Sequence, residues 1–427
     1  MFRVSNPFSF STAILALSLV SLVVMMGSSM AAPSLAPYAG SYAGSNEFVV
    51  GAVIAGFAVG RLLFDIPGGY LADRAGISRT MLLGLGVLVG SSILAGVAPS
   101  FWILLSARIL EGIGSAIYVS AAISFVLLAS DPTKRGTTMG TYQSILMTGP
   151  IVGPVAGAPV AAYFGLNAPY FAFAAMMAGA LALVAYLGYR GTFVIGSCSL
   201  NRDPEEGSKR AGMSLYVNTA GVATFGFAFL RSGIYSTGMP LFAYGNLELT
   251  LFDVGAILTV ASLANLVTSY FSGRITMMYG MRKTLFAAIV FSAALVCIIP
   301  LSSSALELLV IMTLVGVTSG FFGQTIAWAA EQIEDRVRNA NTKSSDNEAR
   351  TIGSHVTRGI GINRMIGDAG LILGPLFVGF LVSLFVADPI VWFVSFGLTG
   401  LLLGIISIIV LRSTHMRDLL RTDATRL

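Results

Sequence analysis

The sequence predicts an all-α membrane protein, with twelve transmembrane helices in two pseudo-symmetric six-helix bundles. Three observations predict this fold class: long apolar stretches at regular intervals, basic residues confined to alternate loops, and an internal repeat. The 427-residue chain is 55% hydrophobic and 11% charged, whereas a soluble domain carries about 25% charged residues. A soluble chain of this composition would expose a largely apolar surface to water. Lipid is therefore the expected solvent.

Twelve stretches are long enough to cross a bilayer as helices, which takes about 20 apolar residues. The first stretch is too long for the core of a cleaved signal peptide. The spans predict an N-terminal bundle over residues 1–190, a cytoplasmic linker over 191–213, a C-terminal bundle over 214–412 and a cytoplasmic tail over 413–427. The predicted spans lie near residues 10–33, 47–67, 80–98, 101–129, 138–163, 169–189, 214–243, 251–273, 284–302, 305–330, 361–386 and 389–411.

Basic residues mark one side of the membrane. All but four of the 25 Lys and Arg residues lie in the termini or in the connections that follow even-numbered spans. The other connections carry acids instead, such as Glu47, Glu248 and Asp388. By the positive-inside rule, both termini lie in the cytoplasm and the number of spans is even, as expected for a multi-pass protein of the plasma or inner membrane. The net positive charge then reflects loops beside anionic lipid and not nucleic-acid binding.

The two halves of the chain repeat each other at three places, in the same order. Two halves joined by one polar linker are typical of rocker-type transporters, which bind their substrate between the halves. The matching segments are Gly69 and Gly76 with Gly273 and Gly280, Leu104–Ser115 with Leu308–Ser319 (both at an offset of 204 residues), and Gly149-x3-Gly153-Pro154 with Gly370-x3-Gly374-Pro375 at an offset of 221.

The loop after the second span, Gly-Tyr-Leu-Ala-Asp-Arg-Ala-Gly-Ile-Ser-Arg at 69–79, resembles the signature loop of the major facilitator superfamily. The two residues before Arg79 depart from the usual basic pair. In that family the loop is a cytoplasmic latch of the outward-open state; the alternative is a basic turn that only fixes topology. We expect Gly69 to allow a close helix contact and Gly76 a tight turn. The expected latch residues are Gly69, Asp73, Arg74, Gly76 and Arg79.

The fifth span resembles the antiporter motif of the same family, which marks proton-coupled exporters and drug exporters in particular. The alternative is a glycine-rich packing face, which many membrane helices have. The first span, with Gly27, Pro33 and Pro37, is similar to a further pattern of the twelve-helix exporters. The motif residues are Gly140, Gly149, Gly153, Pro154 and Gly157, with Ala158 in place of the final glycine.

An arginine lies inside the fourth span, in a stretch that resembles the family's intramembrane Arg-x-x-Gln-Gly-x-Gly motif, with Glu111 in place of the Gln. An Arg in hydrocarbon costs about 2.5 kcal/mol or more, so Arg108 is expected to face protein or water. Glu111 lies one helical turn away on the same face. Two interpretations stay open: a static salt bridge, or a proton site controlled by Arg108 and by solvation.

Two further acids inside spans are alternative proton-coupling sites. Asp65 follows Arg61 by four residues on the second span, and Asp368 follows Arg364 by four on the eleventh. In the family these two helices line the contact between the halves, so the charges would form a network that changes between states. The alternative is that each pair is neutralised within its own helix. Arg231, in the middle of the seventh span, has no acid nearby in sequence and is expected to attract an anionic substrate.

Polar and aromatic residues on the spans that line the cavity in this family are the candidates for substrate contact. Most aromatic residues at this depth are packing residues, and that alternative stays open for each. The candidates are Met30, Tyr118, Gln143, Arg231, Tyr235, Asn265, Gln324 and Trp328.

These features predict a secondary active transporter and not an enzyme. The sequence contains no nucleotide-binding loop, no cluster of metal ligands and no nucleophile paired with a base. We therefore expect no cofactor and no metal, and an ion gradient, most simply of protons, as the energy source. The leading hypothesis is proton-coupled efflux of small organic molecules by a monomer in the lipid bilayer, by alternating access. The alternatives are a symporter or importer of a defined metabolite, such as an organic anion, and a membrane sensor that transports nothing.

Overall fold

The computed structural model describes residues 10–43, 47–129, 135–192, 219–340, 348–384 and 390–424. These residues form helices joined by short turns, with no β-strand among them. Their contacts divide the chain into two units. Unit 1 comprises Met1–Asn201 and Glu248–Thr259, and unit 2 comprises Arg202–Leu247 and Val260–Leu427. The predicted linker lies almost entirely outside the described residues, so its boundaries stay a prediction.

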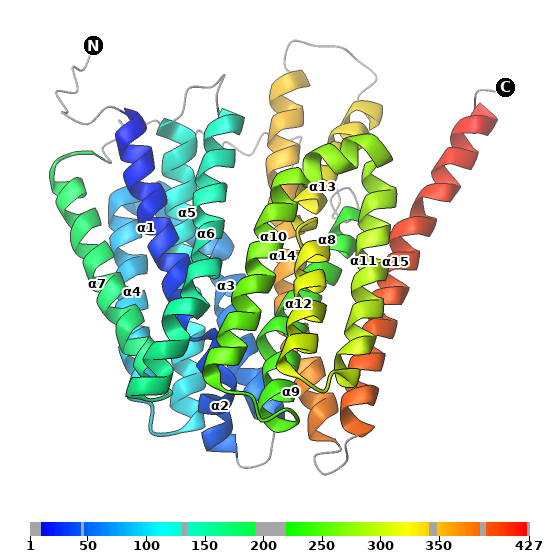
Figure 1. Cartoon of the computed structure of the whole chain (residues 1–427). Coiled ribbons are helices and arrows are strands. Elements are labelled where there is room, and N and C mark those ends of the chain that lie inside the picture. Colours follow the sequence, from blue (N-terminus) through cyan, green and yellow to red (C-terminus); the bar gives the residue numbers. More distant parts are fainter. Residues whose placement is uncertain are drawn as a thin grey trace. The chain divides into compact units, whose positions relative to one another are not determined.

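Unit 1 is a bundle of long helices (Figure 1). Its closest helix pairs are α3 with α5, α4 with α5, α1 with α6 and α4 with α7. The helices are α1 (Phe10–Met30), α2 (Ala32–Ala43), α3 (Glu47–Ala75), α4 (Ile77–Gly96), α5 (Phe101–Ala129), α6 (Arg135–Phe164) and α7 (Ala168–Tyr189).

Unit 2 is a second helical bundle, in which α8 packs on α14 and α11 on α15. The first turns of α10 are grouped with unit 1 and the rest of that helix with unit 2. The elements are α8 (Thr219–Leu230), the π-helix η3 (Arg231–Gly238), α9 (Met239–Gly245), α10 (Leu251–Tyr279), α11 (Met281–Ile298), the 3₁₀ turn η4 (Ile299–Leu301), α12 (Ala305–Ser319), α13 (Phe322–Ala340), α14 (Glu348–Ser383) and α15 (Ile390–Ala424).

Within the described residues, ten helices are long and apolar enough to cross a membrane. The all-α membrane fold is thus confirmed, while the full count of twelve stays a prediction. The predicted span at 138–163 is a 30-residue helix, α6, but it carries three prolines and is not among the ten. The predicted span at 214–243 is also not among them, because it is divided into α8, η3 and α9. None of these three elements is long enough by itself to cross a membrane.

The described part of the span predicted at 214–243 is helical from Thr219 onward, but it is not α-helical throughout. The hydrogen-bond pattern changes to that of a π-helix at Arg231 and returns to α-helical at Met239. Pro240 stands in the first turn of α9, where its missing N–H removes a donor from the preceding ladder. Gly233 and Gly238 lie within η3, and glycine weakens an α-helix by about 1 kcal/mol. Local sequence therefore favours a change of helix type at this point.

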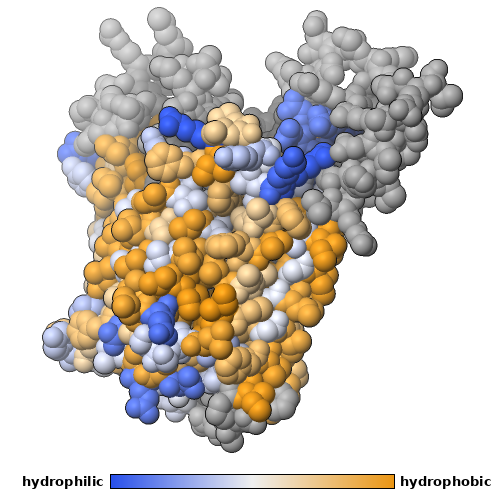
Figure 2. Space-filling model, turned by 45° about the vertical axis from the view of Figure 1, so that its right-hand side comes forward, coloured by the Kyte–Doolittle hydropathy of each residue, from blue (hydrophilic) through white to orange (hydrophobic). Residues whose placement is uncertain are grey.

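The surface of the bundles is largely apolar. Many large side chains are exposed, among them Trp102 at 72%, Tyr163 at 77% and Leu401 at 61%. Figure 2 shows hydrophobic residues over the middle of the face in view and hydrophilic residues toward its ends. Such a surface would associate in water and is stable against lipid tails.

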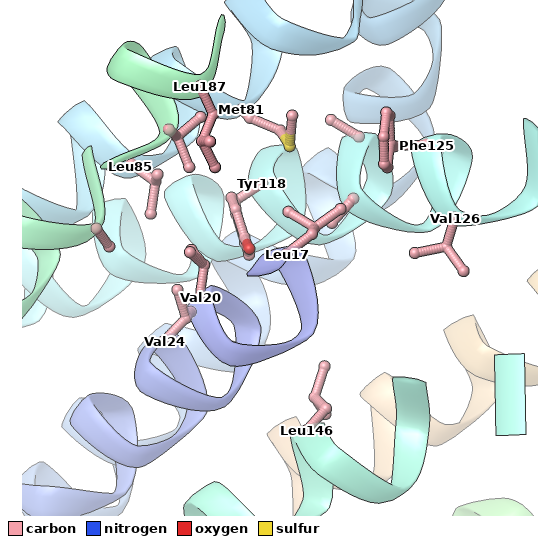
Figure 3. Packing of buried hydrophobic residues seen from close by; sticks show 14 of the residues in the cluster. Leu17, Val20, Val24, Met81, Leu85, Tyr118, Phe125, Val126, Leu146 and Leu187 are labelled. Carbon is pink, nitrogen blue, oxygen red and sulfur yellow. The ribbon is translucent and has the colours of Figure 1, made fainter. Parts of the chain in front are cut away.

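The interior of unit 1 is a packed apolar cluster that draws on α1, α4, α5, α6 and α7 (Figure 3). Leu17 of α1, Leu85 of α4 and Phe125 of α5 are each exposed by 1% or less. Met81 and Tyr118 are fully buried in the same cluster. This close packing fixes the positions of α4, α5 and α7. Several of the polar residues described below belong to these three helices.

The repeat seen in the sequence recurs in the helix crossings of the two units. In unit 1, a Cβ atom on Gly112 would collide with the carbonyl oxygen of Phe57, where α5 crosses α3. In unit 2, a Cβ atom on Gly316 would collide with the carbonyl oxygen of Ala261, where α12 crosses α10. Both residues of the second pair lie 204 positions after those of the first. Each crossing therefore needs glycine for the same reason: one helix backbone touches the other.

The turns after α3 and α10 are also equivalent. Gly76 has φ 90° and ψ 148°, and Gly280 has φ 87° and ψ 136°. Each residue precedes the helix that follows, α4 or α11, and a side chain at such a positive φ would be strained. The expectation of a tight turn at Gly76 is confirmed.

Candidate functional site

A buried ion pair is the most polar feature in the interior of unit 1. Arg108 and Glu111 lie one turn apart on α5, and an Nη of Arg108 donates to a carboxylate oxygen of Glu111. Arg108 is 7% exposed and Glu111 is fully buried. Ser92 of α4 donates to the other carboxylate oxygen at 3.3 Å. The predicted placement of the two charges on one face of the helix is confirmed.

Helix α3 covers the guanidinium group from a third side. The guanidinium carbon of Arg108 lies 5.1 Å from the ring centroid of Phe57, within range of a cation–π interaction. The glycine crossing at Gly112 allows this approach, because it brings the α3 backbone into contact with α5. The Nε of Arg108 is buried and has no hydrogen-bond partner among the described residues. The guanidinium therefore contacts Glu111 and Phe57, while its buried Nε–H has no partner among the described residues.

Three tyrosines, here called the tyrosine cluster, lie beside the ion pair: Tyr38 and Tyr42 of α2 and Tyr170 of α7. The ring centroids of Tyr38 and Tyr42 are 5.5 Å apart, and those of Tyr38 and Tyr170 are 5.8 Å apart. The hydroxyl of Tyr38 donates to the carbonyl of Ala95 at 2.8 Å. That of Tyr42 donates to the carbonyl of Ala98 at 2.6 Å and is 3.2 Å from the hydroxyl of Tyr38.

Tyr170 connects the tyrosine cluster to the ion pair. It is fully buried and interacts electrostatically with Arg108, Glu111 and Tyr42. Its hydroxyl has no hydrogen-bond partner among the described residues. Neither Tyr170 nor the other two tyrosines and Ser92 could be predicted as site residues, because a single uncharged residue in an apolar span carries no local signal.

The residues of the expected latch are described only in part. Arg74 and Arg79 are exposed at the end of α3 and the start of α4, and the guanidinium of Arg74 lies 4.3 Å from the ring centroid of Tyr70. A Cβ atom on Gly69 would meet no atom within 4 Å, so the expected close contact is not found there. The side chain of Asp73 lies outside the described residues. The latch stays a prediction.

The glycines of the antiporter-like motif pack on α1. A Cβ atom on Gly149 would come within 2.6 Å of the Met26 nitrogen, and one on Gly157 would collide with the carbonyl of Met30. Gly153 faces Ser29, whose hydroxyl also lies 3.4 Å from the Gly149 carbonyl oxygen. These glycines form a packing face on α1, which fits both interpretations of the motif. Pro154 lies inside α6, Gly140 is in the same helix but its surroundings are not described, and the meaning of the motif for antiport stays a prediction.

The other two candidate acids differ in exposure. Asp65 and Arg61 are both half-buried on α3, and the carbonyl oxygen of Asp65 accepts a hydrogen bond from Ser120 at 3.2 Å. Asp368 is only 4% exposed on α14, one turn after the half-buried Arg364. Whether either pair takes part in coupling stays a prediction.

The substrate-contact candidates of unit 1 lie in packed surroundings. Met30 is 4% exposed, and Tyr118 is fully buried in the apolar cluster of Figure 3. The hydroxyl of Tyr118 is 2.9 Å from that of Ser21, which is also 3.0 Å from the hydroxyl of Tyr142. These contacts favour the packing interpretation for both candidates. The side chain of Gln143 lies outside the described residues.

The candidates of unit 2 are more accessible. Arg231 is exposed at the first residue of η3. The Tyr235 hydroxyl, also in η3, is buried near Ser319 and interacts electrostatically with Arg231. Asn265 is half-buried on α10, and Gln324 donates to the hydroxyl of Ser272 at 2.9 Å. Arg231 and Tyr235 are four residues apart, so they share one face of the helix, as the sequence spacing predicts.

A cavity of about 350 Å³ lies in unit 2, at the turn between α10 and α11. Trp328, 3% exposed, contributes to its wall, whereas no other predicted substrate residue does. Its wall includes basic residues of the turn and acids of α13. The lining residues are Thr219, Tyr279, Gly280, Met281, Arg282, Lys283, Trp328, Glu331, Gln332 and Asp335.

A second polar group that the sequence analysis missed joins three helices of unit 2. Asn363 of α14 is 1% exposed and donates to the hydroxyl of Thr224 on α8 at 3.0 Å. That hydroxyl lies 2.9 Å from the hydroxyl of Thr325 on α13. All three groups are neutral, and Thr224 hydrogen-bonds to each of the other two, as is usual for buried polar groups.

Comparison with known proteins gives relatives that are transporters. Over 229 residues the chain is 27% identical to Multidrug resistance protein 2 of Bacillus subtilis (strain 168), covering 51% of this chain and 55% of that protein. Over 158 residues it is 29% identical to the Bacillibactin exporter of the same organism, covering 35% of this chain and 39% of the exporter. The alignments thus span about half or less of these relatives.

A solved structure shows the same fold across nearly the whole chain. It is that of a bacterial homolog of the human lysosomal transporter Spinster, in an inward-facing and occupied conformation. The TM-score is 0.68 at 16% identity, over 95% of this chain and 97% of the other. Residues 17–336 and 220–424 match the Major Facilitator Superfamily, two overlapping matches that cover both halves of the sequence. The chain therefore belongs to the Major Facilitator Superfamily of membrane transporters.

Proposed function

We propose that this transporter is a proton-coupled exporter of small organic molecules that works by alternating access. The observation that carries the proposal is the buried pair of Arg108 and Glu111. A carboxylate in this position can exist in two forms: ionised and paired with Arg108, or protonated and neutral. The two forms place different charge in the interior of the unit, where charge is costly, so they favour different conformations.

Two further observations support export over other uses of the pair. The relatives reported above include a multidrug resistance protein and an exporter. The α6 helix carries the spacing of the antiporter motif, and its glycines pack directly on α1. We further propose that the protein works as a monomer in the cell membrane, with both termini in the cytoplasm and no cofactor besides the proton gradient.

Transport in inverted membrane vesicles tests the proposal. With an acidic vesicle interior, vesicles that contain the protein should accumulate the dye ethidium, and a protonophore should abolish the accumulation. Glu111→Gln keeps the shape of the side chain but cannot ionise, and it should reduce gradient-driven accumulation by at least about tenfold. Glu307→Gln, an exposed acid on α12, is the matched control and should leave accumulation unchanged.

Two results would contradict the proposal. Full gradient-driven accumulation by Glu111→Gln would remove Glu111 from coupling. Wild-type vesicles that show no gradient-driven movement of ethidium, or of other cationic and neutral dyes, would count against proton-coupled export itself.

A second candidate function is import of an organic anion, and the observation that favours it is Arg231. This arginine is exposed at the start of a π-helix, a feature often found at functional sites. Uptake of the anionic dye fluorescein into right-side-out vesicles, lost in Arg231→Gln, would support import. Ethidium export that is unaffected by Arg231→Gln would favour the first proposal.

A further inference from the structure

The cavity of about 350 Å³ in unit 2 carries charges of both signs in its wall. Arg282 and Lys283 lie in the first turn of α11. Glu331 and Asp335 are four residues apart on α13 and therefore share one face of that helix. No ion pair joins Lys283 to either acid in the described part of the chain. Pockets for small molecules measure about 300–1,000 Å³, so this cavity has the size for a small ligand.

Two buried side chains of α13 also line the cavity. Trp328 is 3% exposed and Gln332 is 9% exposed. The Gln332 amide donates to the hydroxyl of Thr219 at 3.3 Å and accepts from it at 3.5 Å, which are long hydrogen bonds. A side-chain amide can donate two hydrogen bonds and accept two, so Gln332 keeps capacity for a ligand. The cavity wall thus contains fixed, buried groups as well as exposed charges.

The two sides of the wall favour ligand groups of opposite charge. On the side of α11, Gly280 makes no side-chain cap, and the first N–H groups of a helix have no partner within it. These groups and the helix dipole favour an anion, and the charges of Arg282 and Lys283 act in the same direction. On the side of α13, Glu331 and Asp335 favour a cation. The ring of a tryptophan such as Trp328 can also bind a cation at its face.

We propose that the cavity binds a small zwitterion. Its anionic group, a phosphate or a carboxylate, lies at the start of α11, and its ammonium group lies at Glu331 and Asp335 beside Trp328. Figure 1 shows the turn between α10 and α11 at the end of unit 2 where α15 also ends. The loop charges predict that this end faces the cytoplasm. The ligand is therefore a free zwitterion of the cytoplasm or the headgroup of a zwitterionic lipid, which share this chemistry. The site does not depend on the proposed proton coupling.

Calorimetric titration of the full-length protein in phosphatidylglycerol nanodiscs tests the site, with phosphoethanolamine as the probe. Phosphoethanolamine should bind saturably, and inorganic phosphate or ethanolamine alone should bind at least about tenfold more weakly. Glu331→Gln combined with Asp335→Asn should weaken the binding of phosphoethanolamine by about tenfold and leave that of phosphate unchanged. Lys283→Gln should weaken the binding of both probes, because both carry the anionic group.

The matched controls are exposed charges of unit 2 outside the cavity, Glu307→Gln on α12 and Arg274→Gln on α10, and both should bind phosphoethanolamine as wild type does. No saturable binding by wild type would overturn the proposal. Loss of phosphate and phosphoethanolamine binding to the same extent in the variant without the two acids would overturn the placement of the ammonium group.

Nanodiscs of phosphatidylethanolamine distinguish the two sources of the ligand. An unchanged affinity for the probe in these nanodiscs supports a site for a free zwitterion. An affinity at least about tenfold lower supports a site that the lipid headgroup occupies. The titration involves no proton gradient, so its failure would leave proton-coupled export untouched, and a failure of export would leave this site untouched.

Discussion

The same position in the two units holds a charged pair in one and apolar side chains in the other. Arg108 and Glu111 of α5 correspond to Met312 and Val315 of α12, at the offset of 204 residues that also relates the two glycine crossings. Glu111, Met312 and Val315 are all fully buried. In unit 2, the crossing with the same backbone contact thus has buried Met and Val side chains where unit 1 has the ion pair. The fold does not require the charges at this crossing, which is consistent with the coupling role that we propose for them.

The difference extends to the neighbours of the pair. Ser92, which donates to Glu111, corresponds at the same offset to Val296, which is fully buried. Tyr170 corresponds, at the offset of 221 residues found in the later part of the repeat, to Val391, which is 3% exposed. At these four positions polar residues of unit 1 are replaced by apolar ones in unit 2, and we therefore place the proposed coupling chemistry in unit 1.

The largest expected effect on stability comes from removing only half of the pair. Glu111→Val gives α5 the residue of unit 2 but leaves Arg108 buried without its counter-charge. We expect the free energy of unfolding in mixed detergent micelles to fall by about 3–5 kcal/mol. Glu331→Val, an exposed acid on α13, is the control and should change it by about 0.5 kcal/mol or less. A loss below about 1 kcal/mol for Glu111→Val would mean that the ion pair is not held in a low-dielectric interior.

The two glycine crossings should respond alike to a methyl group. Gly112→Ala and Gly316→Ala each place a Cβ atom against a carbonyl oxygen of the crossing helix, and each should cost about 1–3 kcal/mol of unfolding free energy. Gly86→Ala on α4 is the control, because its Cβ atom would meet nothing within 4 Å. The comparison between the units would be broken if one crossing variant lost stability and the other did not.

The smallest effect on stability is expected when both charges are replaced together. Arg108→Met combined with Glu111→Val reproduces the side chains of unit 2, and an ion pair exchanged for apolar residues is often neutral or stabilising by about 1–4 kcal/mol. The free energy of unfolding of the double variant should therefore equal or exceed that of the wild type, to within about 1 kcal/mol. Its gradient-driven accumulation of ethidium should be lost. A stable double variant that still couples transport to the gradient would assign the proton to another acid, such as Asp368.

The fold class and the family were predictable from the sequence because they depend on quantities that local sequence records. Hydrophobic length determines which segments can cross a bilayer, and loop charge determines their orientation. The pair of Arg108 and Glu111 was predictable for the same reason, since three residues along a helix bring two side chains to one face. What the pair does was not predictable, because a static bridge and a proton site have the same spacing.

The neighbours of the pair escaped prediction because they come from separate helices. Tyr38, Ser92 and Tyr170 are far apart in sequence, and only the packing of α2 and α4 on α5 and of α7 on α4 brings them together. One available signal was the repeat itself: an aligned Ser92 and Val296 show a polar residue in one half only. The π-helix at Arg231 escaped for another reason, because hydropathy records how apolar a segment is and not which carbonyl each N–H bonds.

The glycine crossing has a consequence for how such a protein can change. The contact between Gly112 and the Phe57 carbonyl, like that between Gly316 and the Ala261 carbonyl, is made by backbone atoms. Neighbouring side chains can therefore be exchanged in one copy without moving the helices of either copy. In a duplicated chain with such crossings, one half can carry charged side chains while the other keeps an apolar, stable core. The side chains of each half can then change in evolution without altering the helix packing of the other.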